Sequence, residues 1–289
     1  MKTELIIFEG GDCCGKTTML DKVFEELTSK LYKCGKFKFP VYDGMYGKEI
    51  LDHLKNYDFD NYSKEENFKE LMHFSEISYM NKLSAFNDFM AMVNDNDYDF
   101  ILLDRFALSQ YIYDIAWVEI YDGKRVKSTD SYNQNSDKDI YENCMYTPKI
   151  LNAIRRRASV IMETYKLIFP KITTFVFATN PYVKAIVSYN QNHDKGDRRV
   201  DIYDSLTQYQ QEVSSLMVKS PSYALDDLLG TKAHMIYPSD MIDIPGVKPV
   251  NGYLPTSEYE KNKDAFDVAL KKYTENVVEF IVSEVTNDK

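Results

Sequence analysis

The stretch that decides the fold runs from Phe8 to Thr18 and reads FEGGDCCGKTT. Within it, Gly10, Gly15, Lys16 and Thr17 satisfy the pattern G-x-x-x-x-G-K-[ST] in full. This pattern is typical of a loop whose backbone wraps around phosphate groups, between a strand and a helix. The sequence therefore predicts a phosphate-binding loop close to the start of the chain.

The residues on both sides of the loop fit that context. Residues 5–8 are Leu-Ile-Ile-Phe, a short apolar run typical of a buried strand. After the loop, apolar residues recur at helical spacing, namely Leu20, Val23, Phe24, Leu27 and Leu31. We expect an amphipathic helix that begins near Gly15 and buries this stripe.

The residue types in the loop suit a nucleoside triphosphate. Glycine lets the backbone curl so that successive N–H groups point at phosphate oxygens, and the helix dipole adds positive charge there. Lys16 is expected to reach the β- and γ-phosphates, and the Thr17 hydroxyl to bind Mg²⁺. The expected nucleotide contacts are Gly10, Gly11, Asp12, Cys13, Cys14, Gly15, Lys16, Thr17 and Thr18.

Composition narrows the class of protein. The chain has 289 residues, 44% of them hydrophobic and 28% charged, which is typical of a soluble globular protein. A net charge of −10 argues against a nucleic-acid-binding surface, and no apolar run approaches the roughly 20 residues of a membrane span. Four cysteines without ligand-like spacing favour reduced thiols. Because the first strand begins at once, we expect no signal peptide and a cytoplasmic protein.

Along the rest of the chain, strand patterns alternate with helical patterns. Strands are expected at 36–39, 98–104, 172–179 and 233–237, and helices at 47–54, 64–93, 107–117, 148–169, 203–218 and 257–285, with another opened by Pro181. In the longest helix the expected buried face is Phe68, Leu71, Met72, Ser75, Tyr79, Leu83, Phe86 and Met90. The alternation predicts an α/β fold of the P-loop NTPase type, a three-layer sandwich with a central parallel sheet flanked by helices.

Three polar stretches stand apart from this alternation. Residues 122–146 contain almost no aliphatic side chains, which predicts a surface insertion at about 118–148 within a single domain of residues 1–289. Residues 190–201 are charged and predict a mobile lid. The run Arg155-Arg156-Arg157 is interpreted as a solvated helix face rather than as a phosphate site.

Further motifs resemble those of the thymidylate kinases, a family of P-loop nucleoside monophosphate kinases. The opening resembles that family's F-E-G-x-D-x-x-G-K-T-T, and residues 104–109 (DRFALS) resemble its D-R-Y/F-x-x-S. Phe39-Pro40 followed by Gly47-Lys48 matches its F-P-x-x-x-x-x-x-G-K segment, and residues 71–75 (LMHFS) are similar to its L-L-F-S/A stretch. Asn180-Pro181 and Asp197-Arg198 stand where the family has a turn and a lid, and the order agrees over roughly residues 4 to 215.

The resemblance implies transfer of the γ-phosphate of ATP to a nucleoside monophosphate with Mg²⁺, by a homodimer. It implies that Asp104 and Thr17 hold the metal and that Arg105 binds the acceptor phosphate bidentately. Cys13 stands where one branch of the family has an arginine. The lid residues Lys195, Arg198 and Arg199 are therefore expected to supply the cations, with Arg198 neutralising charge in the transition state.

The resemblance also outlines an acceptor pocket. In family terms Asp12 contacts the deoxyribose 3′-hydroxyl, Phe74 stacks on the base, and Ser109 and Tyr113 line the same pocket. Plainer interpretations stay open: Phe74 as a core aromatic, Asp104–Arg105 as a buried structural pair, and Arg198 as a solvated charge.

Two positions depart from the family pattern. Ser78 stands where an arginine usually reads the pyrimidine edge, and Tyr42 where another arginine follows the F-P pair, with Lys38 the nearest substitute. We therefore count Lys38, Tyr42 and Ser78 among the substrate-binding candidates. The base is left open between dTMP, dUMP and a modified pyrimidine.

Other functions remain as alternatives. A deoxynucleoside kinase would need a carboxylate base near a sugar hydroxyl, and Glu9 lies too early in the loop to be an obvious one. A kinase-like nucleotide-binding protein without turnover is a third interpretation. A GTPase is disfavoured because the sequence has no N-K-x-D-like segment for guanine.

Overall fold

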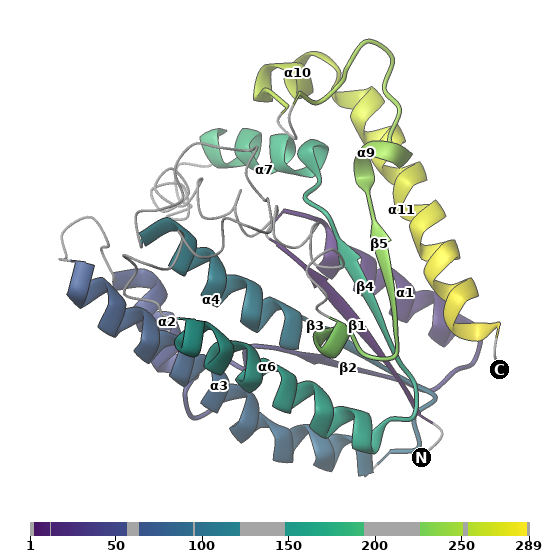
Figure 1. Ribbon diagram of the computed structural model, residues 1–289. Coiled ribbons are helices and arrows are strands. Elements are labelled where there is room, and N and C mark those ends of the chain that lie inside the picture. Colours follow the sequence, from purple (N-terminus) through teal and green to yellow (C-terminus); the bar gives the residue numbers. More distant parts are fainter. Residues whose placement is uncertain are drawn as a thin grey trace.

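The computed structural model describes residues 3–11, 13–56, 64–94, 96–121, 148–193, 226–250 and 254–287. These residues form a five-stranded sheet in the order β2-β3-β1-β4-β5 (Figure 1). The strands are β1 (Glu4–Gly10), β2 (Cys34–Lys38), β3 (Phe100–Asp104), β4 (Ile172–Phe177) and β5 (Lys232–Ile236). Every neighbouring pair is parallel, which confirms the predicted α/β class.

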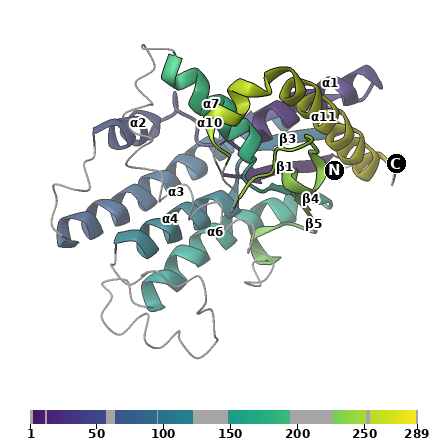
Figure 2. The same ribbon diagram turned by 90° about the horizontal axis from the view of Figure 1, so that it is seen from above.

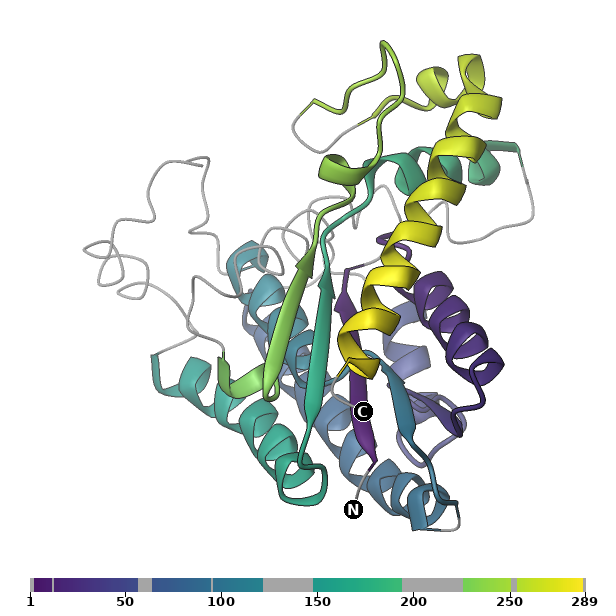
Figure 3. The same ribbon diagram turned by 90° about the vertical axis from the view of Figure 1, so that its right-hand side faces the viewer.

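Helices cover both faces of this sheet. They are α1 (Lys16–Ser29), α2 (Gly47–Asn56), α3 (Lys64–Asn94), α4 (Ala107–Tyr121), α6 (Pro148–Ile168), α7 (Pro181–His193), η3 (Asp226–Leu228), α9 (Pro238–Met241), α10 (Thr256–Lys261) and α11 (Lys263–Thr286). Helices α3, α4 and α6 lie side by side on one face, and α1 and α11 lie on the other (Figures 2 and 3). The described elements are therefore a three-layer sandwich.

The alternation of side chains along β1 explains the two layers. Leu5 and Ile7 point into the core beneath α3, α4 and α6, whereas Ile6 and Phe8 point into the core beneath α1 and α11. All four side chains are fully buried. A central parallel strand buried on both sides matches the continuous apolar run seen in the sequence.

Helix α1 ends two residues earlier than the sequence pattern predicts. Leu31 was expected on its buried stripe, but the helix ends at Ser29 and Leu31 is 91% exposed. Leu31 has a φ of 70°, and the Tyr32 N–H donates to the Leu27 carbonyl, the arrangement of a Schellman cap. Other expected stripe residues, Leu20, Val23 and Leu27, are buried.

The buried face of α3 differs from the expected one. Leu71 and Ser75 are buried as predicted, but Leu83 is 41% exposed. The most buried residues are Leu71, Ser75, Ile77, Ser78, Asn81, Lys82, Ala85, Phe89 and Val93. Polar side chains occupy the middle of the true buried face, so hydrophobic periodicity selects a line of residues beside it.

Three boundaries also need correction. Helix α4 continues to Tyr121, so residues 118–121 are helical and do not belong to the expected insertion, whose remaining residues up to 147 lie outside the described part. Helix α7 continues to His193, so the start of the expected lid is helical, and the rest of the lid and the helix expected at 203–218 lie outside the described residues. The expected C-terminal helix is two helices, α10 and α11, divided at Asn262.

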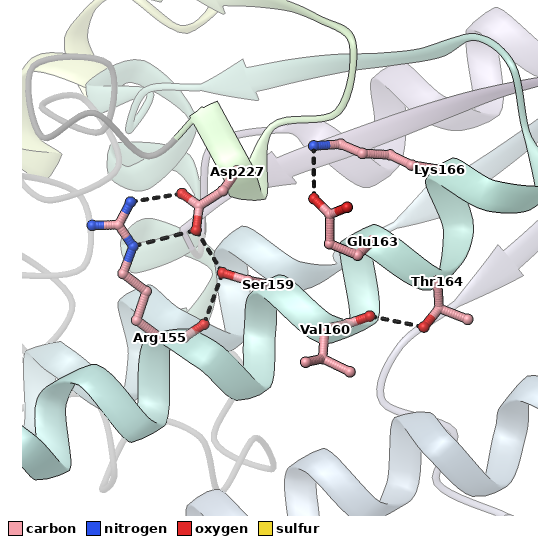
Figure 4. Close-up of polar contacts among 7 residues, drawn as sticks. All are labelled: Arg155, Ser159, Val160, Glu163, Thr164, Lys166 and Asp227. Carbon is pink, nitrogen blue, oxygen red and sulfur yellow. Dashed lines mark hydrogen bonds and ion pairs between the residues drawn. The ribbon is translucent and has the colours of Figure 1, made fainter.

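The arginine run on α6 is only partly solvated. Arg156 is exposed, but Arg155 makes two hydrogen bonds to the Asp227 carboxylate, of 2.7 Å from Nη2 and 3.3 Å from Nε (Figure 4). Ser159 donates to the same carboxylate. The prediction for Arg155 was therefore wrong, because this side chain ties α6 to η3.

Within the described residues, no helix has both the length and the apolar character needed to cross a membrane.

Candidate active site

The loop between β1 and α1 turns sharply at its glycines. Gly10 has a φ of 154°, and a Cβ there would approach the Phe177 carbonyl oxygen to 2.8 Å. Gly15 has a φ of 81° directly before α1. Both positions need glycine, one for the close approach of backbone and the other for its left-handed conformation. Lys16 begins α1 and is buried, with Nζ 3.5 Å from the Gly11 carbonyl oxygen.

The two loop cysteines have different environments. Cys14 is buried, and its Sγ donates a 3.0 Å hydrogen bond to the Gly11 carbonyl. Cys13 is half-buried and has a φ of 57°. Cys14 therefore helps to fold the loop onto itself.

A carboxylate from β3 meets the start of α1. The Thr17 hydroxyl donates a 3.0 Å hydrogen bond to Oδ2 of Asp104, which pairs with Phe8 in the β1–β3 register. Lys38, which pairs with Asp104 in the β2–β3 register, places Nζ 3.6 Å from the same oxygen. Parallel register therefore gathers these groups at the carboxyl edge of the sheet, where ligands bind in such folds.

The donor set at this edge fits a hard divalent cation. Asp104 is 3% exposed, and its Oδ1 is buried without a hydrogen-bond partner among the described residues. A buried carboxylate oxygen without a partner is costly. Carboxylate and hydroxyl oxygens are ligands that Mg²⁺ accepts. Asp104 and Thr17 could therefore hold Mg²⁺, directly or through water.

Arg105 reaches back across the loop. It has a φ of 67°, an uncommon conformation for a residue with a side chain, and its N–H donates to the Phe8 carbonyl at 2.9 Å. Its Nη1 donates to the Gly10 carbonyl at 3.2 Å and to the Tyr113 hydroxyl at 2.6 Å. The guanidinium carbon also lies 5.0 Å from the centre of the Tyr113 ring. These contacts hold a cation beside the loop between β1 and α1.

Glu9 is a site residue whose role sequence reasoning missed. It is 1% exposed and accepts hydrogen bonds from the N–H groups of Phe106 (2.9 Å) and Ser109 (3.1 Å), and from the Ser109 hydroxyl. Burial raises the pKa of Glu9, although these hydrogen bonds and the charge of Arg105 oppose that effect. Glu9 thus caps α4, as acidic groups at helix N-termini do. The Ser109 hydroxyl, expected to line the acceptor pocket, is engaged in this cap.

The expected acceptor residues lie on several elements. Phe74 is half-buried, and its ring stacks on that of His53 with centroids 4.4 Å apart. Burial, aided by His73, lowers the pKa of His53 to about 4. Ser78 is buried, whereas Tyr42 is 39% exposed.

The loop carboxylate and the lid cations of the sequence prediction lie outside the described residues: Asp12, Lys195, Arg198 and Arg199.

A second set of polar residues that sequence reasoning missed lies between α3 and α4. Lys82 Nζ donates to Gln110 Oε1 at 2.7 Å, Gln110 Nε2 donates to Asp114 Oδ2 at 3.1 Å, and Ser75 donates to the same Asp114 oxygen at 2.7 Å. All four side chains are buried. The available signal was the helical spacing of Ser75 and Lys82, but polar residues at such spacing resemble a solvated face.

Comparison with known proteins gives a likeness to solved structures. Neither a scan against models of protein families nor a search of curated proteins finds a match. Among solved structures, this chain is similar to thymidylate kinase from Ehrlichia chaffeensis, with 14% sequence identity and a TM-score of 0.39. The match covers 81% of this chain and 92% of that one.

The combined geometry suits charge neutralisation. A buried lysine, an arginine and a carboxylate gather around the loop between β1 and α1. One oxygen of that carboxylate has no hydrogen-bond partner among the described residues. Phosphoryl transfer needs positioning and cations around the moving group, and little covalent chemistry from the protein.

Proposed function

We propose that this single-domain protein is a nucleoside monophosphate kinase that transfers the γ-phosphate of ATP to a deoxypyrimidine monophosphate, dTMP, dUMP or a modified pyrimidine. The observation that carries the proposal is the hydrogen bond between Thr17 and Asp104. It joins the G-x-x-x-x-G-K-[ST] loop to the Asp-Arg pair that follows β3. This juxtaposition puts the nucleotide-binding loop beside Arg105, the cation proposed for the acceptor.

The reaction forms one bond and breaks one. An oxygen of the acceptor phosphate bonds to the γ-phosphorus while the bond from that phosphorus to the β,γ-bridging oxygen breaks, which gives ADP and a nucleoside diphosphate. Lys16 binds oxygens of the β- and γ-phosphates, and Arg105 holds the acceptor phosphate close to the negatively charged γ-phosphate. Both cations offset repulsion between the two phosphates as they approach.

Thr17 and Asp104 are the residues that would hold Mg²⁺, which when bound supplies further positive charge to the β- and γ-phosphates. Lys38 lies 3.6 Å from Asp104 and is a further cation at this edge. We further propose that Arg198 of the expected lid neutralises charge in the transition state and that Asp12 contacts the sugar hydroxyl.

A deoxynucleoside kinase is the alternative with the same donor. It would need a carboxylate free to take a proton from a sugar hydroxyl. Glu9 accepts hydrogen bonds from two backbone N–H groups and a hydroxyl at the start of α4, which makes it a helix cap rather than a base. This favours a phosphate over a hydroxyl as the acceptor.

The deciding test is ADP release from Mg²⁺–ATP with a panel of acceptors: dTMP, dUMP, dCMP, dGMP, dAMP, thymidine and deoxyuridine. We expect activity with dTMP or dUMP, and its loss in Lys16→Ala, by about a hundredfold or more, without loss of the fold. Activity with the nucleosides alone would establish the alternative. ATP binding without turnover on any acceptor would leave a non-catalytic nucleotide-binding protein. That the protein is a homodimer remains a prediction, and light scattering would test it.

A further inference from the structure

The polar cluster between α3 and α4 contains two formal charges in a buried place. Ser75 is 3% exposed, Gln110 is 6% exposed, and Lys82 and Asp114 are each 7% exposed. Burying an ammonium and a carboxylate costs free energy, and apolar side chains of similar volume often stabilise a core as well or better. Packing alone therefore gives no reason for these two residues.

The two charges are bridged by a neutral group. The carbonyl oxygen of Gln110 accepts from Lys82, and the NH₂ of Gln110 donates to Asp114. Lys82 has three N–H donors, and its one described hydrogen bond is the one to Gln110. Burial lowers the pKa of Lys82 to about 8 and raises that of Asp114 to about 6, so both charges are held at a cost.

The bridging amide presents a particular pattern to its partners. Its C=O faces a cation, and its N–H faces a carboxylate. The same order of acceptor and donor occurs along the edge of uracil and thymine, where the C4=O carbonyl adjoins the N3–H. Lys82 and Asp114 are therefore already arranged around an amide edge.

The cluster adjoins the residues proposed for the acceptor. Ser78 lies on the same buried face of α3, between Ser75 and Lys82. Arg105 is close enough for its charge to contribute to the lowered pKa of Lys82. Gln110 and Asp114 directly follow Ser109 and Tyr113 on α4.

We propose that Lys82 and Asp114 read the base of the acceptor nucleotide, with Lys82 donating to the C4 carbonyl and Asp114 accepting from N3–H. The base then takes over the contacts that Gln110 satisfies in the free protein. A carboxylate facing N3 attracts the N–H of uracil or thymine but repels the N3 lone pair of cytosine. Among pyrimidines, the site thus selects those with two ring carbonyls, and Lys82 and Asp114 take the place of the arginine that the family resemblance puts at Ser78. This inference rests on the proposed function.

The test compares Lys82→Met and Asp114→Asn with matched controls on the exposed side of α3, Lys69→Met and Asp88→Asn. We measure kcat/KM and the equilibrium dissociation constants for dTMP, dUMP and dCMP. Both site variants should lose at least about tenfold in kcat/KM for dTMP, and Asp114→Asn should lose far less for dCMP, because an asparagine can donate to N3. The controls should match the wild-type protein, and the KM for ATP should stay the same.

Gln110→Ala should have the opposite effect on the binding of dTMP. It removes the group that competes with the base, so it should lower the dissociation constant for dTMP and increase the thermal shift that dTMP produces. A purely structural amide would weaken binding of every nucleotide instead.

The outcomes separate this inference from the proposed function. If the wild-type protein phosphorylates dTMP but the variants lose dTMP and dCMP in equal proportion, the base-reading role is overturned and the kinase stands. A wild-type preference for dCMP would also overturn it. If the protein binds dTMP in an Asp114-dependent manner without turnover, the kinase proposal fails and the base-reading role stands. Absence of binding to every nucleotide would overturn both.

Discussion

The Thr17 hydroxyl lies 3.0 Å from Oδ2 of Asp104, although 87 residues separate them in the sequence. The hydrogen bond joins the first turn of α1 to the end of β3. Because Oδ1 of Asp104 is buried without a hydrogen-bond partner in the described part of the chain, the pair offers oxygen ligands at the carboxyl edge of the sheet.

This relationship predicts a metal dependence. Thr17→Val keeps the shape of the side chain but removes its oxygen, and Asp104→Asn removes the carboxylate charge. Each should raise the Mg²⁺ concentration needed for half-maximal ADP release by about 10- to 100-fold. A magnesium titration at saturating ATP measures this. Thr28→Val, on the exposed end of the same helix, is the control and should behave as the wild-type protein. An unchanged magnesium requirement in both site variants would remove the pair from the metal role.

Arg105 is expected to bind the acceptor rather than ATP. Arg105→Ala removes the guanidinium that now contacts Gly10 and Tyr113, so the acceptor KM should rise and kcat should fall, each by about tenfold or more. The KM for ATP should change little. Initial rates over a grid of ATP and acceptor concentrations separate the two effects.

Tyr113→Phe sharpens this test. It removes the hydroxyl that holds Nη1 at 2.6 Å but keeps the ring beneath the guanidinium. We expect the acceptor KM to rise in Tyr113→Phe, but several times less than in Arg105→Ala. If Arg105→Ala raised the KM for ATP alone, Arg105 would belong to the donor site.

Local patterns in the sequence predicted the loop and the strands because their determinants lie within a few residues. Gly10 and Gly15 are required by backbone geometry at the loop itself, and Asp104 ends a continuous apolar strand. The contact between Glu9 and Ser109 spans 100 residues, so no short pattern reveals it. The capping role of Glu9 becomes evident only when the fold brings β1 next to the start of α4.

The polar cluster escaped prediction for a different reason. Hydrophobic periodicity assumes that buried residues are apolar, whereas the central buried positions of α3 include Ser75, Ser78 and Lys82. The expected face therefore shifted toward Leu83, which is 41% exposed. The part of α3 where hydrophobic periodicity and observed burial disagree is the part that packs around the buried charges of Lys82 and Asp114.

Glu9 is expected to stabilise α4 rather than to act as a base. Glu9→Ala leaves the N–H groups of Phe106 and Ser109 without their acceptor, which should lower the free energy of unfolding by about 1–3 kcal/mol per group left buried. Glu9→Gln retains an oxygen for these donors and should recover most of the stability and the activity. Chemical denaturation and ADP release measure the two. A Glu9→Gln protein that folds as well as wild type but is as inactive as Glu9→Ala would make Glu9 a base.

Asp114 should make stability depend on pH below neutrality. Burial raises its pKa in the folded protein from 3.8 to about 6, so between these values the folded state holds a proton that the unfolded chain has released. The contribution of Asp114 to the free energy of unfolding therefore falls as the pH rises through that window, and it is constant above the window. Since one pKa unit corresponds to about 1.4 kcal/mol, the change is at most about 3 kcal/mol.

Asp114→Asn isolates this contribution because it cannot titrate. Denaturant unfolding of the wild-type and variant proteins at a series of pH values from 4 to 8 gives the difference in their free energies of unfolding. We expect the wild-type protein to lose stability relative to the variant as the pH rises from 4 to about 6, with no further relative loss above that. Asp88→Asn, on the exposed side of α3, controls for loss of a carboxylate at the surface. A wild-type protein that instead gained stability over the variant across this window would show that Asp114 is ionised at its ordinary pKa or below it, with its charge compensated inside the cluster.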